Sequence, residues 1–479
     1  MYKGVIFNVI CNLLFVISGY LVHFFLGTTM TPAQYGLIGS IITILDFEYL
    51  FLNNGVRQSL SKEISKNRYD IKDLILKGIL FQFVLIIIMG SINYFGAGIF
   101  AHILKDNGLV VYLKYAALLI PFNGLYVVTM GINEGFHHFK SSAVIGIIYS
   151  LAKLSVIPMI LFVFNDAILG TESGFLFAII CALITGIITI IYHRKDLAKK
   201  YSEKIQMSSY VKNTLNFSVF FIIVSVVLSV DTLIVKAIEP DAAMAGYYTG
   251  GINFAKVSYF ILSAFFTIIL PIVTRYYTEG KLAEAKKTIE TMFMIILSFV
   301  MPITMIISAS GGALLSSFYS KEYIYAGNTL MVLALSHFFM GLVVMFNMII
   351  SSTNRKKFSS TLSIIMVVFD ILLCIILTKK FGIIGTASAG VICTTVAMLV
   401  SGKYMMNIFG KVINSKHIRA IIMNIVLWIV VKTLFSIISI NNILLLGLVY
   451  FVIYIIMLFI LNILKIMNIK EIIKIVKKN

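Results

Sequence analysis

The sequence predicts an all-α membrane protein that crosses the bilayer many times. Of its 479 residues, 60% are hydrophobic and only 12% are charged, and the mean hydropathy is +1.00. Apolar runs of about 20 residues recur along the chain, and this is the length that an α-helix needs to span the hydrocarbon core. Because the runs are continuous rather than alternating, they disfavour a β-barrel as well as a soluble globular fold.

The expected spans start close to the first residue. No small-residue cleavage pattern follows Met1 and Lys3, so we interpret the first apolar run as a span rather than a signal peptide. Prolines inside later spans are expected to bend them. The fourteen predicted helices cover about residues 4–26, 36–56, 75–95, 109–132, 142–164, 173–192, 213–238, 246–272, 289–309, 327–351, 358–378, 383–403, 418–438 and 442–464.

Positive charge alternates from loop to loop. Thirty of the 39 Lys and Arg residues lie in alternate loops and tails, against four in the opposite loops, namely Lys105, Lys321, Lys379 and Lys380. The positive-inside rule therefore places both termini in the cytoplasm of a bacterial cell, with the chain in the cytoplasmic membrane. Because the net charge of +19 is dispersed over short loops, it does not indicate nucleic-acid binding.

The basic segment 193–212 separates two similar stretches. The second span starts at Tyr35-Gly36 and the eighth at Gly246-Tyr247, and each leads into a basic amphipathic loop. Further on, the motif GFHHFKSS at 135–142 matches NRKKFSST at 354–361. Since six spans is an even number, the two bundles are expected to share one orientation about a pseudo-two-fold axis along the membrane normal. We expect an N-terminal six-helix lobe at 1–192, a cytoplasmic linker at 193–212, a C-terminal six-helix lobe at 213–404, and two extra helices with a basic cytoplasmic tail at 405–479.

Several charged side chains lie inside predicted spans, where each costs about 2.5–3.5 kcal/mol at a helix centre. Lys153 and Lys256 are too deep to reach the interface easily, so we expect them to face a wet cavity. Arg57 and Lys236 lie near span ends, where they either snorkel or mark the approaches to that cavity. The candidate substrate-binding residues are Lys153, Lys256, Arg57, Lys236, Asn53, Asn253 and Asn12.

Helical spacing places polar residues on common faces. In the second span, Asp46, Tyr49, Asn53 and Arg57 fall near one face of a regular helix, and hydroxyl stripes follow the seventh and eighth spans. Small and hydroxyl residues also mediate dry helix packing, so such stripes alone leave both interpretations open. The added charges favour a cavity.

Asp46, Asp231 and Asp370 are candidates for coupling transport to a proton or sodium gradient. A carboxylate in a membrane span is exceptional unless it has a function or a cation partner. The alternative is static, with each carboxylate neutralising a nearby lysine or arginine.

Nothing in the sequence indicates an enzyme. There is no phosphate-binding glycine loop, no nucleotide fingerprint and no His/Cys set with metal-ligand spacing, so no catalytic residue, metal or cofactor is expected. The longest predicted outer segment is too short for the large outer loop of a membrane-embedded glycosyltransferase or polymerase. All four cysteines fall inside apolar runs and are interpreted as small buried hydrophobes; they are Cys11, Cys181, Cys374 and Cys393.

The chain resembles the multidrug/oligosaccharidyl-lipid/polysaccharide flippase superfamily, and most of all its Wzx-type polysaccharide branch. The motifs are TPAQYGLIGS at 31–40, NNGVRQSL at 53–60, AGYYTGGINFAK at 245–256 and ILPIVTRYYTEGKLAEAKK at 269–287. The resemblance implies two six-helix bundles, a central cavity walled by spans one, two, seven and eight, and alternating access.

The implied function is a flippase for a polyprenyl-pyrophosphate-linked oligosaccharide used in cell-surface polysaccharide assembly. A proton- or sodium-coupled multidrug cation antiporter is the alternative within the superfamily. Deep lysines suit an anionic substrate better, because an ammonium pairs strongly with phosphate where water is scarce. The expected partners are the lipid-linked oligosaccharide, a proton or sodium ion, membrane lipids and a polysaccharide polymerase.

Overall fold

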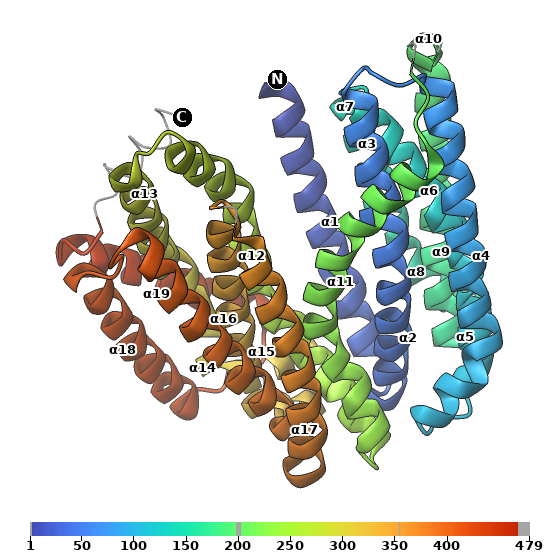
Figure 1. The fold of residues 1–479 in the computed structure, drawn as a ribbon. Coiled ribbons are helices and arrows are strands. Elements are labelled where there is room, and N and C mark those ends of the chain that lie inside the picture. The colour runs from blue at the N-terminus through green and yellow to red at the C-terminus, as the bar shows by residue number, and fades with distance from the viewer. Residues whose placement is uncertain (1, 198–202, 354, 468–479) are drawn as a thin grey trace. The chain divides into compact units, whose positions relative to one another are not determined.

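The computed structural model describes residues 2–197, 203–353 and 355–467, and the ordered elements in these ranges are helices (Figure 1). Nine helical segments in the described part are long and apolar enough to cross a membrane, and Leu13–Thr29 forms a shorter apolar helix. The prediction of an all-α membrane protein is confirmed. Every predicted span overlaps a helical segment, while the number of fourteen crossings stays a prediction.

The chain forms two compact units, Met1–Ala237 and Ile238–Asn479. In the first unit, α1 packs on α7, α6 packs on both α3 and α9, and α4 packs on α5. Its elements are α1 (Tyr2–Thr29), α2 (Pro32–Phe51), η1 (Leu52–Val56), α3 (Arg57–Ser65), α4 (Ile71–Ile103), α5 (Leu109–Ala116), α6 (Leu119–Gly135), α7 (Phe139–Ala152), η2 (Lys153–Ser155), α8 (Val156–Pro158), η3 (Met159–Val163), α9 (Ala167–Tyr192), α10 (Arg194–Leu197) and α11 (Met207–Ile238).

Helix α11 belongs to the first unit almost entirely, although it starts in the predicted linker and its residues from 213 on fall in the predicted C-terminal lobe. Side chains near its two ends explain this grouping. Tyr210 packs edge-on against Phe81 of α4, with ring centroids 6.4 Å apart, and Lys236 forms an ion pair with Asp106 after α4. The predicted linker also contacts this unit, because Arg68 forms an ion pair with Glu203 at 2.6 Å. The predicted lobe boundaries remain predictions.

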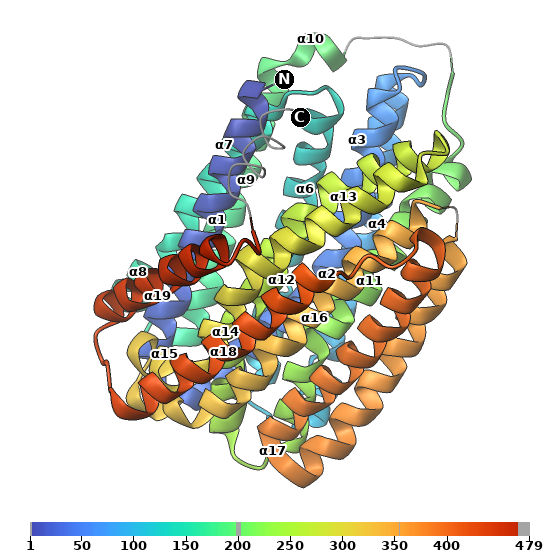
Figure 2. The ribbon, with the colours of Figure 1, turned by 90° about the vertical axis from the view of Figure 1, so that its left-hand side faces the viewer.

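In the second unit, α12 and α17 both pack on α16. The C-terminal helices α18 and α19 lie against α14 (Figure 2). Asn424 of α18 donates to the Leu297 carbonyl at 2.9 Å, and Trp428 donates to the Ser308 hydroxyl at 3.1 Å. The elements are α12 (Ala242–Thr278), α13 (Leu282–Ile295), η4 (Ile296–Val300), α14 (Met301–Ala309), α15 (Gly311–Phe318), η5 (Lys321–Ala326), α16 (Gly327–Ser351), α17 (Lys356–Phe409), α18 (Ser415–Ile437) and α19 (Ile443–Ile463).

Helix α17 is a pair of helices joined at Gly382. The backbone there has φ 63° and ψ −150°, which L-residues with a side chain rarely adopt. The arms meet where the Thr378 and Thr386 hydroxyls hydrogen-bond at 2.7 Å. This break separates the predicted eleventh and twelfth spans.

Helix starts follow from local side-chain chemistry. Thr31 and Gln34 form a capping box at the start of α2, with Pro32 in its first turn. Asp166 accepts from the Ile168 and Leu169 amides at the start of α9. These contacts satisfy amides that a helix terminus leaves without an intrahelical partner.

Irregular helix turns lie at candidate residues. The π-helical turn η1 contains Asn53 and ends just before Arg57, and the 3₁₀ turn η2 begins at Lys153. Pro158 follows η2 and lacks the N–H that would bond to the Leu154 carbonyl, which favours a local departure from α-geometry. Such turns are frequent at functional sites.

Candidate substrate and ion sites

Arg57 is neutralised within the first unit by Glu134 of α6. Its Nε donates to Glu134 Oε2 at 3.0 Å, and its Nη2 donates to Glu134 Oε1. The two side chains are 35% and 22% exposed. This bidentate pair fastens the start of α3 to the end of α6. Glu134 lies just beyond the predicted span 109–132 and was therefore not among the predicted site residues.

A row of stacked aromatic rings lies between Arg57 and Lys153. The Tyr126 and Tyr149 rings stack with centroids 5.8 Å apart, and Tyr149 stacks on Phe15 of α1 at 6.1 Å. Lys153 Nζ lies 4.6 Å from the centroid of the Phe15 ring, and Arg57 lies within electrostatic range of Tyr126. We call Tyr126, Tyr149 and Phe15 the aromatic row. A cation therefore lies at each end of the aromatic row. In this row Tyr126 and Tyr149 are half-buried and Phe15 is exposed.

Lys153 has a neighbour of opposite charge. Asp46 of α2 lies within electrostatic range of it, and Gly19 of α1 leaves room beside the amine, since a Cβ there would lie 3.4 Å from Nζ. Lys153 is half-buried and Asp46 is exposed. The structure thus brings together two of the predicted residues, one from the proposed substrate set and one from the proposed coupling set.

Asn53 and Lys236 each pair with a residue that the sequence analysis did not single out. Asn123 donates to Asn53 Oδ1 at 2.9 Å. Lys236 Nζ lies 2.7 Å from Asp106 Oδ2, and its side chain is only 6% exposed. Lys236 is thus buried and neutralised rather than extended into water. The side chain of Asn12 lies outside the described part of the chain.

Of the remaining candidates, Asn253, Lys256 and Asp370 lie in the second unit and Asp231 lies in the first. Asn253 and Lys256 lie one turn apart on α12, and both are half-buried. Lys256 lies within electrostatic range of His337 on α16, whose Nδ1 contacts the Leu333 carbonyl at 3.0 Å. Asp370 on the first arm of α17 is buried, with 2% of its surface exposed. In the first unit, Asp231 is also buried, and its carboxylate accepts from the Thr232 amide at 2.8 Å.

Glu48 and Glu172 of the first unit also carry buried carboxyl groups. Glu48 accepts a hydrogen bond from Asn93 at 3.1 Å, and Glu172 has no hydrogen-bond partner for either carboxyl oxygen among the described residues. Both lie within electrostatic range of Tyr49. Glu172 was missed because the predicted sixth span starts at residue 173, whereas α9 starts at Ala167.

The fold is that of transporters of the multidrug/oligosaccharidyl-lipid/polysaccharide flippase superfamily. The lipid II flippase MurJ in an inward closed conformation is 16% identical, with a TM-score of 0.70 over 98% of this chain and 100% of that one. An inward-facing multidrug resistance MATE transporter is 12% identical, with a TM-score of 0.66 over 83% of this chain and 94% of that one.

Sequence comparison defines the family. The model for polysaccharide biosynthesis proteins matches residues 1–277, more than half of the chain, and the protein belongs to this family. The MatE family model matches residues 221–376. Uncharacterized membrane protein MJ1068 of Methanocaldococcus jannaschii is 23% identical over 408 residues, covering 80% of each chain. The resemblance found in the sequence motifs is confirmed, and the protein is a membrane transport protein of this superfamily.

Proposed function

We propose that the protein is a flippase that moves a polyprenyl-pyrophosphate-linked oligosaccharide from the inner to the outer leaflet by alternating access, for cell-surface polysaccharide assembly. Membership of the polysaccharide biosynthesis family and the fold shared with the lipid II flippase support this. The observation that carries the proposal is the aromatic row of the first unit, with a cation at each end.

The chemistry of such a substrate matches this arrangement. Its pyrophosphate is anionic, and Lys153 offers a half-buried ammonium that pairs strongly with phosphate oxygens in a dry environment. Sugar rings have apolar C–H faces, which pack on flat aromatic surfaces. The aromatic row thus suits the glycan, and Lys153 suits the adjacent phosphate.

We also propose that Lys256 of the second unit binds substrate. Lys256 is half-buried on α12, one turn from Asn253, so the two offer an ammonium and an amide on the same helix face. Arg57 forms an ion pair with Glu134, so it binds phosphate only if this pair opens. Lys236 forms an ion pair with Asp106 and likewise binds phosphate only if that pair opens.

The test replaces Lys153 and Lys256 by Ala, singly and together, in protein reconstituted into liposomes. Flipping of a fluorescent polyprenyl-pyrophosphate oligosaccharide is followed by its access to a membrane-impermeant quencher. We expect each Ala variant to lose at least tenfold in initial rate, and Lys153→Arg to recover part of it, because the charge remains while the geometry changes. Parental rates in the double Ala variant would refute the assignment.

Lys432 provides the matched control. Its Nζ lies 4.7 Å from the centroid of the Trp428 ring on the same helix, so it too is a lysine of a membrane helix beside an aromatic ring. It lies on the appended helix α18 of the second unit, whereas the aromatic row belongs to the first unit. Lys432→Ala should flip substrate at the parental rate, and an equal loss there would show that Lys153→Ala reports a general effect of removing charge.

Proton- or sodium-coupled export of organic cations is the second candidate, favoured by the MatE match and by the buried carboxyl groups Glu48 and Glu172. A cationic dye distinguishes the two functions. Dye efflux that depends on these carboxyl groups, without flipping of the lipid-linked oligosaccharide, would support the antiporter.

We also propose that Asp46, Asp231 and Asp370 couple flipping to an ion gradient. A triple Asn variant that keeps its full response to an imposed proton or sodium gradient would exclude that role.

A further inference from the structure

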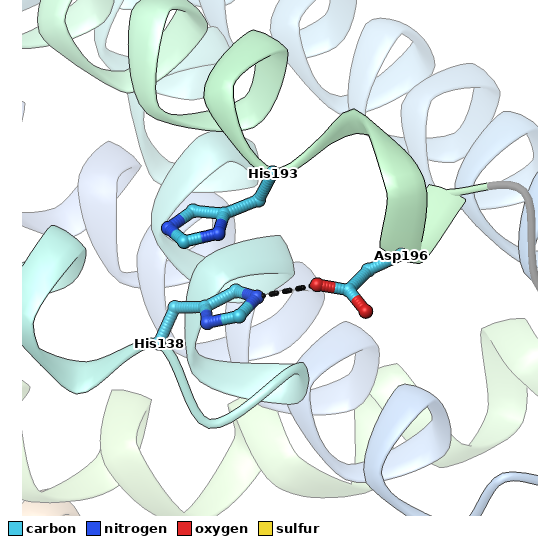
Figure 3. A group of neighbouring side chains, drawn as sticks. All are labelled: His138, His193 and Asp196. Carbon is cyan, nitrogen blue, oxygen red and sulfur yellow. Dashed lines mark hydrogen bonds and ion pairs between the residues drawn. The ribbon is translucent and has the colours of Figure 1, made fainter.

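Two histidines and one aspartate gather at the junction of α9, α10 and the turn before α7 (Figure 3). His138 precedes α7, His193 ends α9, and Asp196 lies on α10. Each offers a ligand atom, and these atoms lie within 4.8 Å of one another. Among the described residues, these three form the one group of three or more His, Cys, Asp or Glu side chains that lie close enough together to bind the same ion. We call it the His-Asp cluster.

The side chains of the cluster already contact one another. His138 Nε2 lies 2.8 Å from Asp196 Oδ2, and the two imidazole rings stack with centroids 3.7 Å apart. His193 Nε2 lies 3.2 Å from the Ser141 hydroxyl. The side chains of His138 and Asp196 are about one quarter exposed, at 24% and 23%. An ion from solution therefore has access to a site that is partly shielded.

Backbone hydrogen bonds fix the positions from which these side chains project. The His138 amide donates to the Asn133 carbonyl at 2.8 Å, and the His193 amide donates to the Thr189 carbonyl at 3.1 Å. The Asp196 amide donates to the His193 carbonyl at 3.0 Å. Because the backbone is held, the cluster adapts to a ligand by rotating side chains.

Two imidazoles and a carboxylate are a ligand set of zinc sites that keep an open fourth position. Because the two rings stack nearly parallel, at 10°, their in-plane nitrogen lone pairs do not converge on one point. One ring must therefore turn so that both nitrogens reach about 2.0–2.1 Å from an ion. Rotation of His193 exchanges its contact with the Ser141 hydroxyl for a metal bond, and rotation of His138 exchanges its contact with Asp196.

We propose that His138, His193 and Asp196 bind a divalent transition-metal ion of the zinc class. The ion joins the start of the segment 193–212 to the turn between α6 and α7. It fastens two parts of the first unit that are 55 residues apart in sequence. This inference is independent of the transported substrate.

Zinc titration tests the site. The full chain, without an affinity tag and stripped with a chelator, is titrated with Zn²⁺ in detergent by calorimetry. We expect one ion per chain at this cluster, and His193→Ala and Asp196→Asn to weaken binding by at least tenfold, since even losing an outer-shell partner costs roughly 10–100-fold. Zinc should also raise the Tm of the parent but not of these variants.

His137 is the matched control because it lies in the same turn and is exposed. Its φ is 60°, so His137→Asn is the suitable change, since Asn tolerates this region. This variant should bind zinc as the parent does. Equal Tm values of all variants in chelator would show that the substitutions leave the fold intact.

Cobalt identifies the ligands. Co²⁺ bound at the cluster should give visible d–d bands without the thiolate charge-transfer band that a cysteine site would produce. Binding of zinc that is unchanged in His138→Ala and His193→Ala would mean an adventitious ion only. A thiolate band that persists in these variants would equally overturn the assignment.

Discussion

The Arg57–Glu134 pair gives the sharpest test of the structure. Removing either partner leaves the other charge partly buried, because the side chains are only 35% and 22% exposed. A hydrogen bond to a charged group contributes about 1.5–3 kcal/mol, but partial exposure reduces the interaction, and polar pairs in membrane proteins average about 0.6 kcal/mol with a maximum near 1.7. For a bidentate pair we expect an interaction energy of about 1–2 kcal/mol.

A double-mutant cycle measures this energy. Arg57→Ala, Glu134→Ala, the double variant and the parent are unfolded reversibly in mixed detergent micelles, and the free energies of unfolding are compared. The exposed pair of Lys281 and Glu279, 54% and 41% exposed, serves as the control cycle and should give a smaller interaction energy, because solvent screens an exposed pair. If the losses in free energy of unfolding of the two single variants add up to that of the double variant within about 0.3 kcal/mol, the pairing would be refuted.

The same variants separate a static role of Arg57 from a role in substrate binding. If Arg57 only balances Glu134, the double Ala variant should flip substrate better than Arg57→Ala, because no charge is left without its partner. If Arg57 contacts the substrate phosphate, Glu134→Gln should increase substrate affinity by releasing the guanidinium. A double variant as inactive as Arg57→Ala would exclude the purely static role.

Three further predictions follow from packing, backbone and topology. Gly131→Ala should destabilise the protein by about 1–3 kcal/mol, seen as a lower Tm, because its Cβ would lie 2.8 Å from the Arg57 carbonyl oxygen; an unchanged Tm would contradict the contact of α3 and α6. Gly382→Ala should cost about 1–3 kcal/mol and lower the Tm, because a backbone with φ 63° and ψ −150° lies in a region that is essentially restricted to glycine; an unchanged Tm would argue against that conformation. In a variant without native cysteines, a cysteine at the exposed position Ala283 should label only from the cytoplasm, and labelling from outside intact cells would reverse the predicted orientation.

Hydropathy predicted where the helices lie but not where they end. Charged residues lower the hydropathy at span ends. The predicted fourth span therefore ended before Glu134 and the predicted sixth span began after Glu172, whereas helices α6 and α9 include these residues. Backbone hydrogen bonding sustains a helix beyond its apolar stretch. The partner of Arg57, Glu134, lies in such an extension, and the partner of Lys236, Asp106, lies in the loop after α4.

Long-range pairing was not predictable from one sequence. Glu134 lies 77 residues from Arg57, and Asp106 lies 130 residues from Lys236. Helical periodicity relates residues one or two turns apart, and it carries no information on which helices are neighbours. For the same reason, the spacing search for metal ligands did not find His138 and His193.

The helix that holds Asp46 and Arg57 departs from regular α-helical periodicity. The predicted polar stripe from Asp46 to Arg57 assumed a regular α-helix, but the π-helical turn η1 lies between them. One inserted residue turns the following part of the helix by about 100° relative to the preceding part. Asp46 and Arg57 therefore do not follow one continuous face, and they have different partners, Lys153 and Glu134.

The different partners of Asp46 and Arg57 affect the role proposed for Asp46 in ion coupling. The charge of Asp46 balances Lys153, so Asp46→Asn should change substrate binding in the same assays as Lys153→Ala, rather than the response to a gradient alone. Asp231 and Asp370 are buried whereas Asp46 is exposed, and an acidic residue buried in a membrane span is expected to have a functional role. They are therefore better placed than Asp46 to respond to an ion gradient. If Asp46→Asn alone removed the gradient response while substrate affinity stayed at the parental value, this division of roles would be wrong.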